Sequence, residues 1–346
     1  MKQHHILEEQ GILPREAKKH TLSDKKMNVY FVVRNKNFGS SLMRAYQIQN
    51  ELSKSCDNIR VVELKNIESL YEQKKSYFIW IGPIGIEHIS KFKMKHVHIL
   101  DLIDKYLSNT NTINEALQKN VYSYLFVNNK YMKRFFSRNH GFQGKIFVLH
   151  HHYDTRYEKT ITNVPSNKLQ FGYMGSILSL LHTDNFLHYK KIGQKYNVQF
   201  FDTENGEIMD DYVYDDNKLK NFKKNHKHSS ENIPSVVSIN CQISIRNVNG
   251  PVAKFKTTAK MATAIVLGHN IITTYEESVK DILPPDYPFL LHSTDFESVD
   301  KMFRLVQQDY YSDKKLWNKG LAMLKEAKSK LSIQFIARRY RNILKI

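Results

Sequence analysis

A short run of basic and hydroxyl side chains precedes an apolar helical pattern in the second half of the sequence. It contains Lys256, Thr257, Thr258 and Lys260, and small and aliphatic residues follow as far as Gly268. The first turn of a helix presents free backbone N–H groups and the positive end of the helix dipole, which favour a phosphate. The threonine hydroxyls would donate to its oxygens, and a lysine would supply a full charge. The run predicts a diphosphate site, and a capped helix with solvated lysines is the alternative interpretation.

Residues at the ends of predicted strands could complete this site. Arg246 ends one strand just upstream, and a guanidinium matches a diphosphate bidentately. Gly175 and Ser176 end another strand, where the backbone could approach the same group. Glu276 and Glu277 follow the next strand and are candidates for acidic contacts with the ligand. Acidic residues at a helix start are also common because they interact favourably with the dipole.

These residues must be positioned by a series of short apolar segments that alternate with helical patterns. The predicted strands are residues 28–33, 59–64, 77–82, 96–101, 122–127 and 145–151, and then 169–175, 197–202, 234–247, 270–274 and 288–292. Strands that are apolar throughout and separated by helices predict parallel sheets that are covered on both faces. The predicted fold class is therefore α/β, with two Rossmann-like parallel-sheet domains facing a central cleft, followed by C-terminal helices.

The predicted organisation has four parts. Residues 1–26 are a polar leader without the apolar core of a secretory signal. Residues 27–155 form the first Rossmann-like domain and residues 156–330 the second. Residues 331–346 have the apolar spacing of an amphipathic helix, which we expect to cross back onto the first domain, with a membrane anchor as the alternative.

Composition limits the class of protein. With 346 residues and 41% hydrophobic content, the chain can bury the cores of two domains. Only Cys56 and Cys241 are present, which favours a reducing compartment, and we expect a cytoplasmic location. The net charge of +18 favours an anionic partner such as a nucleotide phosphate, nucleic acid or an acidic membrane face. The competing explanation for this charge is that the lysines serve only to keep the protein soluble.

Several segments carry a family resemblance. The stretch "KTTAKMATAIVLGHNIITT" (256–274) resembles the donor-binding segment of nucleotide-sugar glycosyltransferases with the two-domain GT-B fold, although Asn270 stands where proline is usual. In the same order, "FGYMGSI" (171–177) is similar to the strand end that opens their donor domain, and "KIFVLHHHYD" (145–154) resembles the segment that closes their acceptor domain. The resemblance is closest to the family 4 type group, the glycosyl transferases of group 1.

This resemblance implies a hexosyl- or pentosyltransferase that moves a sugar from a nucleotide-diphosphate sugar to a hydroxyl of a glycan or glycoconjugate. It implies no cofactor besides this co-substrate and no metal, because basic side chains and helix dipoles stabilise the leaving diphosphate. The acceptor domain would be the first and the donor domain the second. The group commonly has two glutamates ahead of the glycine, where this chain has Phe255 and Thr263, so the stereochemical outcome cannot be carried over.

The first domain must supply contacts to the acceptor. An inverting route needs a base near the acceptor hydroxyl, and Asp101 and His151, at or near strand ends, are the candidates. Gly39, Ser40 and Gly82 lie in loops after strands and are expected to face the cleft. The alternative is a structural role for both candidate bases and ordinary turns for both loops. Consecutive histidines alternate faces on a strand, so no metal site is predicted around His151.

The basic charge leaves a second class of function open. A nucleic-acid-binding protein, or a DNA-base glucosyltransferase of the same architecture, would use the basic surface to bind phosphates. An anionic membrane surface is a further candidate partner, which would make the protein peripheral at a membrane. The sequence indicates no obligate protein partner.

Overall fold

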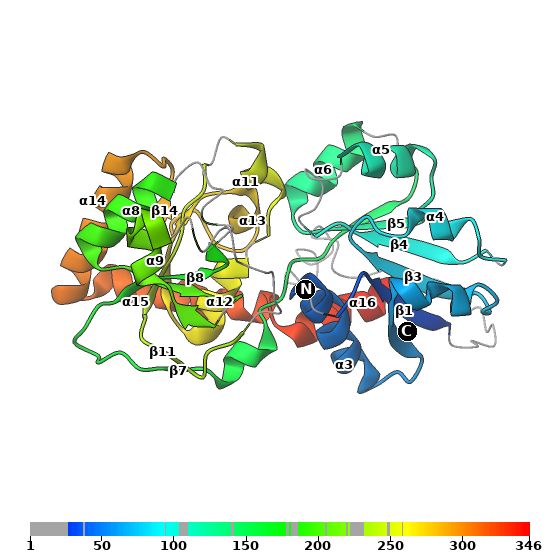
Figure 1. Ribbon diagram of the computed structural model, residues 1–346, viewed down its shortest axis with the longest axis horizontal. Coiled ribbons are helices and arrows are strands. Elements are labelled where there is room, and N and C mark those ends of the chain that lie inside the picture. The colour runs from blue at the N-terminus through cyan, green and yellow to red at the C-terminus, as the bar shows by residue number, and fades with distance from the viewer. Residues whose placement is uncertain are drawn as a thin grey trace, which may run out of the picture.

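The computed structural model shows two α/β units side by side (Figure 1). It describes residues 27–36, 39–93, 95–103, 110–139, 142–177, 180, 186–204, 206–218, 221, 232–247, 250–257 and 259–346. The predicted polar leader, residues 1–26, and Thr258 of the predicted diphosphate site lie outside these ranges. Each unit is built on one six-stranded sheet, so the predicted α/β class with two Rossmann-like sheets is confirmed.

The first sheet is parallel and doubly wound. From edge to edge its strands are β2 (Ile59–Glu63), β1 (Asn28–Val33), β3 (Ser76–Ile81), β4 (Val97–Asp101), β5 (Tyr124–Val127) and β6 (Lys145–Val148). The chain places β2 on one side of β1 and β3 on the other, so the strand order reverses between β1 and β3. A crevice forms at the carboxyl ends of the strands at such a reversal.

Helical segments cover both faces of this sheet, which explains why its strands are apolar throughout. Along β1, Val29 and Phe31 belong to one core and Tyr30 and Val32 to the other. The first face is covered by the π-helical segment η1 (Leu42–Gln47), α3 (Ile48–Ser53) and α16 (Ile333–Leu344). The second is covered by the 3-10 helix η2 (Leu64–Leu70), α5 (Thr110–Gln118) and α6 (Lys130–Asn139). Two shorter helices, α2 (Gly39–Ser41) and α4 (Ile86–Ile89), follow β1 and β3.

The second sheet repeats this winding. From edge to edge its strands are β10 (Glu207–Ile208), β9 (Gln199–Asp202), β8 (Phe171–Gly175), β12 (Cys241–Ser244), β13 (Asn270–Thr274) and β14 (Leu290–Leu291). Only the pairing of β10 with β9 is antiparallel among the described strands. The strand order reverses between β8 and β12, which makes the carboxyl ends of these two strands the expected ligand position.

The remaining elements complete the second unit and return the chain to the first. They are η4 (Thr155–Lys159), β7 (Ile161–Thr162), α8 (Phe186–Tyr196), α9 (Asp210–Tyr214), β11 (Val236–Val237), α11 (Pro251–Phe255), α12 (Ala259–Leu267), α13 (Glu277–Lys280), α14 (Phe296–Tyr311) and α15 (Lys315–Lys330). The expected division at residue 155 falls between β6 and β8. Residues 331–346 hold α16, which packs against α3 on the first core (Figure 1, red).

One predicted strand is divided in the structure, and several others are shorter than predicted. Residues 234–247 form two strands, β11 and β12, instead of one. The break lies at Asn240, whose side chain accepts a hydrogen bond from the amide of Gln170 at 2.9 Å and donates to the carbonyl of Lys168 at 2.8 Å. Where the strand is interrupted, the side chain of Asn240 therefore makes hydrogen bonds to backbone groups that a neighbouring strand would otherwise make.

The two units touch through α6 of the first and α11 and α13 of the second (Figure 1). Phe255, at the end of α11, is 4% exposed and belongs to the second core of the first unit. Its ring meets those of Tyr131 and Phe135 edge to face, with centroids 5.7 Å and 5.2 Å away. Asn128 and Asn129, just after β5, donate to the carbonyls of Phe255 at 3.0 Å and Lys254 at 3.1 Å.

Candidate functional site

Arg246 and Glu276 form a buried ion pair beside the reversal point of the second sheet. Arg246 follows β12 and Glu276 follows β13, so the parallel strands deliver both side chains to one edge. Arg246 Nη1 lies 2.7 Å from Glu276 Oε1, and the two side chains are 18% and 3% exposed. The same nitrogen donates to the carbonyl of Thr257 at 3.3 Å, which ties the loop before α12 to the pair.

The environment of this pair sets its protonation. Burial would lower the pKa of Arg246, but the neighbouring Glu276 carboxylate outweighs it, so the pKa is raised and the guanidinium stays charged. Burial raises the pKa of Glu276, while Arg246 and Lys260 oppose that shift. Among the described residues, Glu276 Oε2 is buried without a hydrogen-bond partner. A buried acceptor of this kind is costly unless a ligand or water satisfies it.

Lys260 brings a second cation to the same edge from the first turn of α12. Its Nζ lies 5.0 Å from the centre of the Tyr173 ring, a residue of β8. A Cβ built on Gly175 would lie 2.9 Å from Lys260 Cε and 3.3 Å from its Nζ. Glycine at the end of β8 therefore makes room for the lysine, and Gly175, Lys260 and Arg246 converge on the carboxyl ends of β8 and β12.

The start of α12 lies close to where the sequence predicts it. The helix begins at Ala259, so Lys260 lies in its first turn, whereas Lys256 and Thr257, which were also expected there, lie just before the helix. Thr257 is buried and Lys256 is half-buried. At the other end, Gly268 follows the last helical residue with φ +72°, the left-handed conformation of a helix C-cap. The short helix α11, immediately upstream, was not predicted.

Ser176 and Glu277 differ in their relation to this cluster. Ser176 directly follows Gly175, and its carbonyl accepts a hydrogen bond from Tyr173 Oη at 3.2 Å, so it borders the cluster. Glu277 has other partners than its neighbour Glu276. Its carboxylate lies 2.7 Å from Lys280 Nζ and 3.7 Å from Arg134 Nη2 on α6 of the first unit.

Asp101 is engaged in a buried network in the first unit. Its Oδ2 accepts hydrogen bonds from Arg44 Nε at 2.9 Å and from Tyr340 Oη on α16 at 3.1 Å, and the residue is 0% exposed. Arg44 also donates to the carbonyl of His150 at 3.0 Å. This geometry favours a structural role, because a fully covered and ion-paired carboxylate does not meet an acceptor hydroxyl.

The other predicted residues of the first unit lie near the carboxyl ends of its strands. His151 follows β6, is buried, and places Nδ1 3.1 Å from the carbonyl oxygen of His152. Gly39 and Ser40 are half-buried in α2 after β1. Gly82 follows β3 with φ +83°, and its amide donates to the carbonyl of Asp101 at 2.8 Å. Gly82 and α2 therefore flank the reversal point between β1 and β3.

Several residues around the site were missed from the sequence. Tyr173 and Tyr189 line the Arg246 side of the cluster, and Tyr189 Oη donates to the carbonyl of Ile245 at 2.8 Å. Asn128 and Asn129 connect the two units, and the signal for them was present: two amides directly after a buried strand. No pattern distinguishes the buried tyrosines from ordinary core residues.

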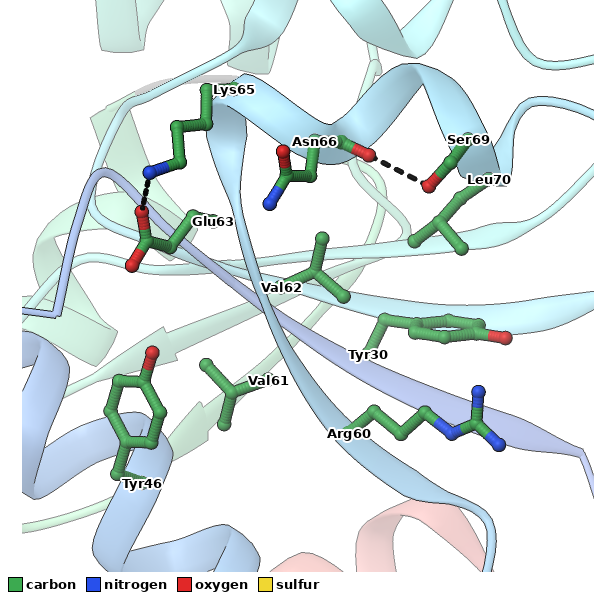
Figure 2. A pocket seen from close by; sticks show the side chains of 10 residues that line it. All are labelled: Tyr30, Tyr46, Arg60, Val61, Val62, Glu63, Lys65, Asn66, Ser69 and Leu70. Carbon is green, nitrogen blue, oxygen red and sulfur yellow. Dashed lines mark hydrogen bonds and ion pairs between the residues drawn. The ribbon is translucent and has the colours of Figure 1, made fainter.

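A separate pocket of about 460 Å³ lies at the outer edge of the first sheet. Figure 2 shows its lining around the edge strand β2 and the start of η2, with Lys65 paired to Glu63. None of the predicted site residues lines it; the lining residues are Tyr30, Tyr46, Arg60, Val61, Val62, Glu63, Lys65, Asn66, Ser69 and Leu70. The pocket is therefore distinct from the Arg246 cluster.

The described residues contain neither a candidate metal site nor a candidate membrane span. No group of three or more histidine, cysteine, aspartate or glutamate side chains is arranged to hold a metal ion in the part of the chain that the structure describes. Over the same residues, no helix has the length and apolar character needed to cross a bilayer.

Comparison with solved structures defines the fold as GT-B. The chain is similar to HepE from Anabaena in complex with UDP and glucose, with a TM-score of 0.59 and 11% identity over 92% of this chain and 100% of that one. It is also similar to sucrose-phosphate synthase from Thermosynechococcus elongatus, with a TM-score of 0.63 and 8% identity over 92% and 98% of the two chains. The lipopolysaccharide outer core galactosyltransferase WaaB in its apo form gives a TM-score of 0.51 at 10% identity over 92% and 99%.

Sequence comparison adds nothing to this assignment. No protein-family model matches the chain, and no curated protein matches it. At these identities the structural similarity establishes the fold alone, and the function must be argued from the site.

Proposed function

We propose that the protein is a glycosyltransferase that uses a nucleotide-diphosphate sugar as donor. One observation carries the proposal: Arg246, Lys260 and Gly175 meet at the reversal point of the second sheet, beside the start of α12. Doubly wound sheets bind ligands at this position, and two cations with a helix N-terminus suit a diphosphate. The structures of HepE in complex with UDP and with UDP-glucose, which share this fold, favour a uridine nucleotide for this chain.

The chemistry would be leaving-group stabilisation. As the sugar–phosphate bond breaks, negative charge accumulates on the diphosphate, and cations already held in place stabilise that charge without reorganising. Arg246 is fixed by Glu276, while the side chain of Lys260 lies over Gly175. Lys256, Thr257 and Ser176 border the same position and would donate to the phosphate oxygens. No metal ion is needed in this proposal, because the two cations supply the charge.

Glu276 would have a second role in this site. Its Oε1 holds Arg246, and its Oε2 is a buried acceptor in need of a donor. A hydroxyl of the donor sugar or of the ribose would satisfy it. Glu276 would then take the role of one of the two glutamates that the family commonly has and that this chain lacks. Glu277 would serve the contact between the two units instead, through Arg134.

The acceptor would bind against the first unit. The loops at α2 and Gly82 flank the reversal point of its sheet and are the proposed acceptor contacts, with Gly39 and Ser40 in the first loop. Of the two proposed bases, we retain His151, because Asp101 is engaged by Arg44 and Tyr340. The acceptor is proposed to be a glycan or glycoconjugate.

A panel of donors tests the proposal. The purified chain is incubated with UDP-, GDP-, ADP- and TDP-sugars, with water as the acceptor of the sugar, and release of the nucleoside diphosphate by hydrolysis is measured for the wild type, Lys260→Met and the control Lys325→Met. Lys325 is exposed on α15 and makes none of the contacts described for the site. We expect turnover of one donor class that is lost in Lys260→Met and kept in the control. Absence of turnover with every donor, or turnover that Lys260→Met leaves unchanged, would contradict the proposal.

A further inference from the structure

A strongly basic surface lies where the two units meet. It is formed by α6 of the first unit and by α11 and α13 of the second, which are adjacent (Figure 1). We call it the basic rim and define it by the cations of these helices: Lys130, Lys133, Arg134, Arg138, Lys254 and Lys280. The same helices contain one acidic residue, Glu277, so cations greatly outnumber carboxylates.

The acidic groups near the rim are already engaged in contacts between its helices. Glu277 is shared between Lys280 and Arg134, and the Asp281 carboxylate accepts a hydrogen bond from the amide of Lys130 at 2.6 Å. Much of the cationic surface remains open to solvent: the side chain of Arg134 is 57% exposed and that of Lys280 is 41% exposed. Because six cations face only these two carboxylates, the rim keeps a net positive charge.

The rim borders the proposed donor site through the chain itself. Glu277 directly follows Glu276 of the buried ion pair. Thr257, whose carbonyl accepts from Arg246, lies two residues beyond the end of α11. Helices α11 and α13 of the rim therefore directly adjoin, along the chain, segments that contact Arg246.

We propose that the basic rim binds an anionic acceptor, namely a glycan or glycoconjugate chain that carries phosphate or carboxylate groups. This inference rests on the proposed function, because it names the class of acceptor for the same site. Cations from both units at one boundary suit a chain that lies across it. Their Coulomb attraction would hold such a substrate with little demand on geometry.

Two other anionic partners fit the rim less well. Binding to a membrane surface usually combines charge with inserted apolar side chains. The exposed large apolar residues among those described are Ile161, Ile208, Val236, Phe296 and Tyr311, and none of them belongs to the rim. Binding to single-stranded nucleic acid uses stacking on open aromatic rings. The rings of Tyr131 and Phe135 on α6 are instead packed against Phe255.

The test compares two charge-reversal variants of the full chain. Lys133→Glu with Arg138→Glu changes the rim at exposed positions that make none of the contacts between the units described above. Lys325→Glu with Lys330→Glu makes the same charge change at exposed positions of α15. Binding is measured in low salt to linear polyphosphate, an oligouronate, neutral dextran, duplex DNA and phosphatidylglycerol vesicles, and thermal unfolding checks that both variants fold.

We expect the wild type to bind polyphosphate or the oligouronate and to ignore dextran. The rim variant should bind these polyanions about tenfold more weakly than the wild type, and the affinity of the control should stay within about twofold of the wild type. The expected loss is moderate because exposed charge pairs are individually weak and screened by salt. Equal weakening in both variants would overturn the proposal, as would binding only to DNA or only to vesicles.

Titration with UDP separates this inference from the proposed function. Both variants should keep the wild-type affinity for UDP, because neither alters the Arg246 cluster. UDP binding without polyanion binding would overturn the rim proposal and leave the donor site standing. Rim-dependent polyanion binding without any nucleotide binding would overturn the glycosyltransferase proposal and, with it, the assignment of the rim to an acceptor.

Discussion

Replacing Asp101 with asparagine distinguishes a structural carboxylate from a catalytic one. Asp101 Oδ2 accepts from Arg44 Nε at 2.9 Å and from Tyr340 Oη at 3.1 Å, and the side chains of Asp101 and Arg44 are 0% and 2% exposed. Asparagine would keep one acceptor oxygen but would leave the Arg44 guanidinium buried without a counter-charge. Removing one partner of a buried ion pair costs about 3–5 kcal/mol, which we expect as the loss in free energy of unfolding of the first unit.

Tryptophan fluorescence can follow the unfolding of each unit separately, because each unit contains one tryptophan. Trp80 is buried in β3 of the first unit and Trp317 in α15 of the second. In a Trp317→Phe background, fluorescence during urea unfolding reports on the first unit alone. Tyr340→Phe is the matched control, since it removes one hydrogen bond to the same carboxylate and keeps the ion pair. We expect it to cost about 1.5–3 kcal/mol.

The opposite pattern would refute this interpretation. If Asp101 were the base, Asp101→Asn would unfold at the wild-type urea concentration while transfer to the acceptor was abolished. A double substitution sharpens the result, because replacing Arg44 and Asp101 together by Met and Leu removes both charges. We expect it to cost less than Asp101→Asn alone, since no charge is then left unpaired.

Two further perturbations test other parts of the structure. Burial, with a smaller contribution from His96, lowers the pKa of His98 to about 3, so His98 stays neutral in the folded state while the unfolded state binds a proton below about pH 6.5. His98 should therefore contribute a loss of stability of about 2 kcal/mol between pH 7 and pH 5. Urea unfolding at the two pH values should show a pH-dependent loss that is smaller by this amount in His98→Gln but unchanged in His292→Gln, an exposed control. A Cβ on Gly172 would lie 2.1 Å from Ile239 Cγ2, so Gly172→Ala should lower the free energy of unfolding by about 1–3 kcal/mol. Gly250→Ala, whose Cβ would meet nothing closer than 3.4 Å, should stay within about 0.5 kcal/mol, and equal effects of the two glycine variants would contradict this packing argument.

Local patterns were sufficient for most of the fold. Strand β1 and strand β13 have the predicted bounds, because apolar runs that are buried on both faces leave a clear signal in the sequence. The error at residues 234–247 arose because Asn240 acts through Gln170 and Lys168, about 70 residues away, and no local pattern reveals that partner.

The convergence of candidate residues was predictable where they lie directly at strand ends. Arg246 and Gly175 meet at one edge as expected, since parallel strands bring their carboxyl ends together. The sequence could not separate Glu276 from Glu277, because adjacent residues share the same local pattern. Only the folded chain turns Glu276 to Arg246 and Glu277 to Arg134.

Long-range partners explain the other limits. Asp101 was chosen for its strand-end position, yet its partner Tyr340 lies 239 residues later in the chain. Phe255 was noted only as a departure from a glutamate pattern. In the fold it carries the apolar contact between the two units, a role that depends on where α6 lies.

The claim that a nucleoside diphosphate binds beside Arg246 is tested most directly by calorimetric titration with UDP. Lys260→Met is the informative variant, because replacing Arg246 would leave the buried Glu276 unpaired and confound binding with folding. A hydrogen bond to a charged group is worth about 1.5–3 kcal/mol, which corresponds to an affinity about 10- to 150-fold weaker. We predict UDP binding to the wild type and to Lys325→Met, with a loss of this size in Lys260→Met. Equal affinity in all three proteins, or no binding of UDP, GDP, ADP or TDP to the wild type, would contradict the account.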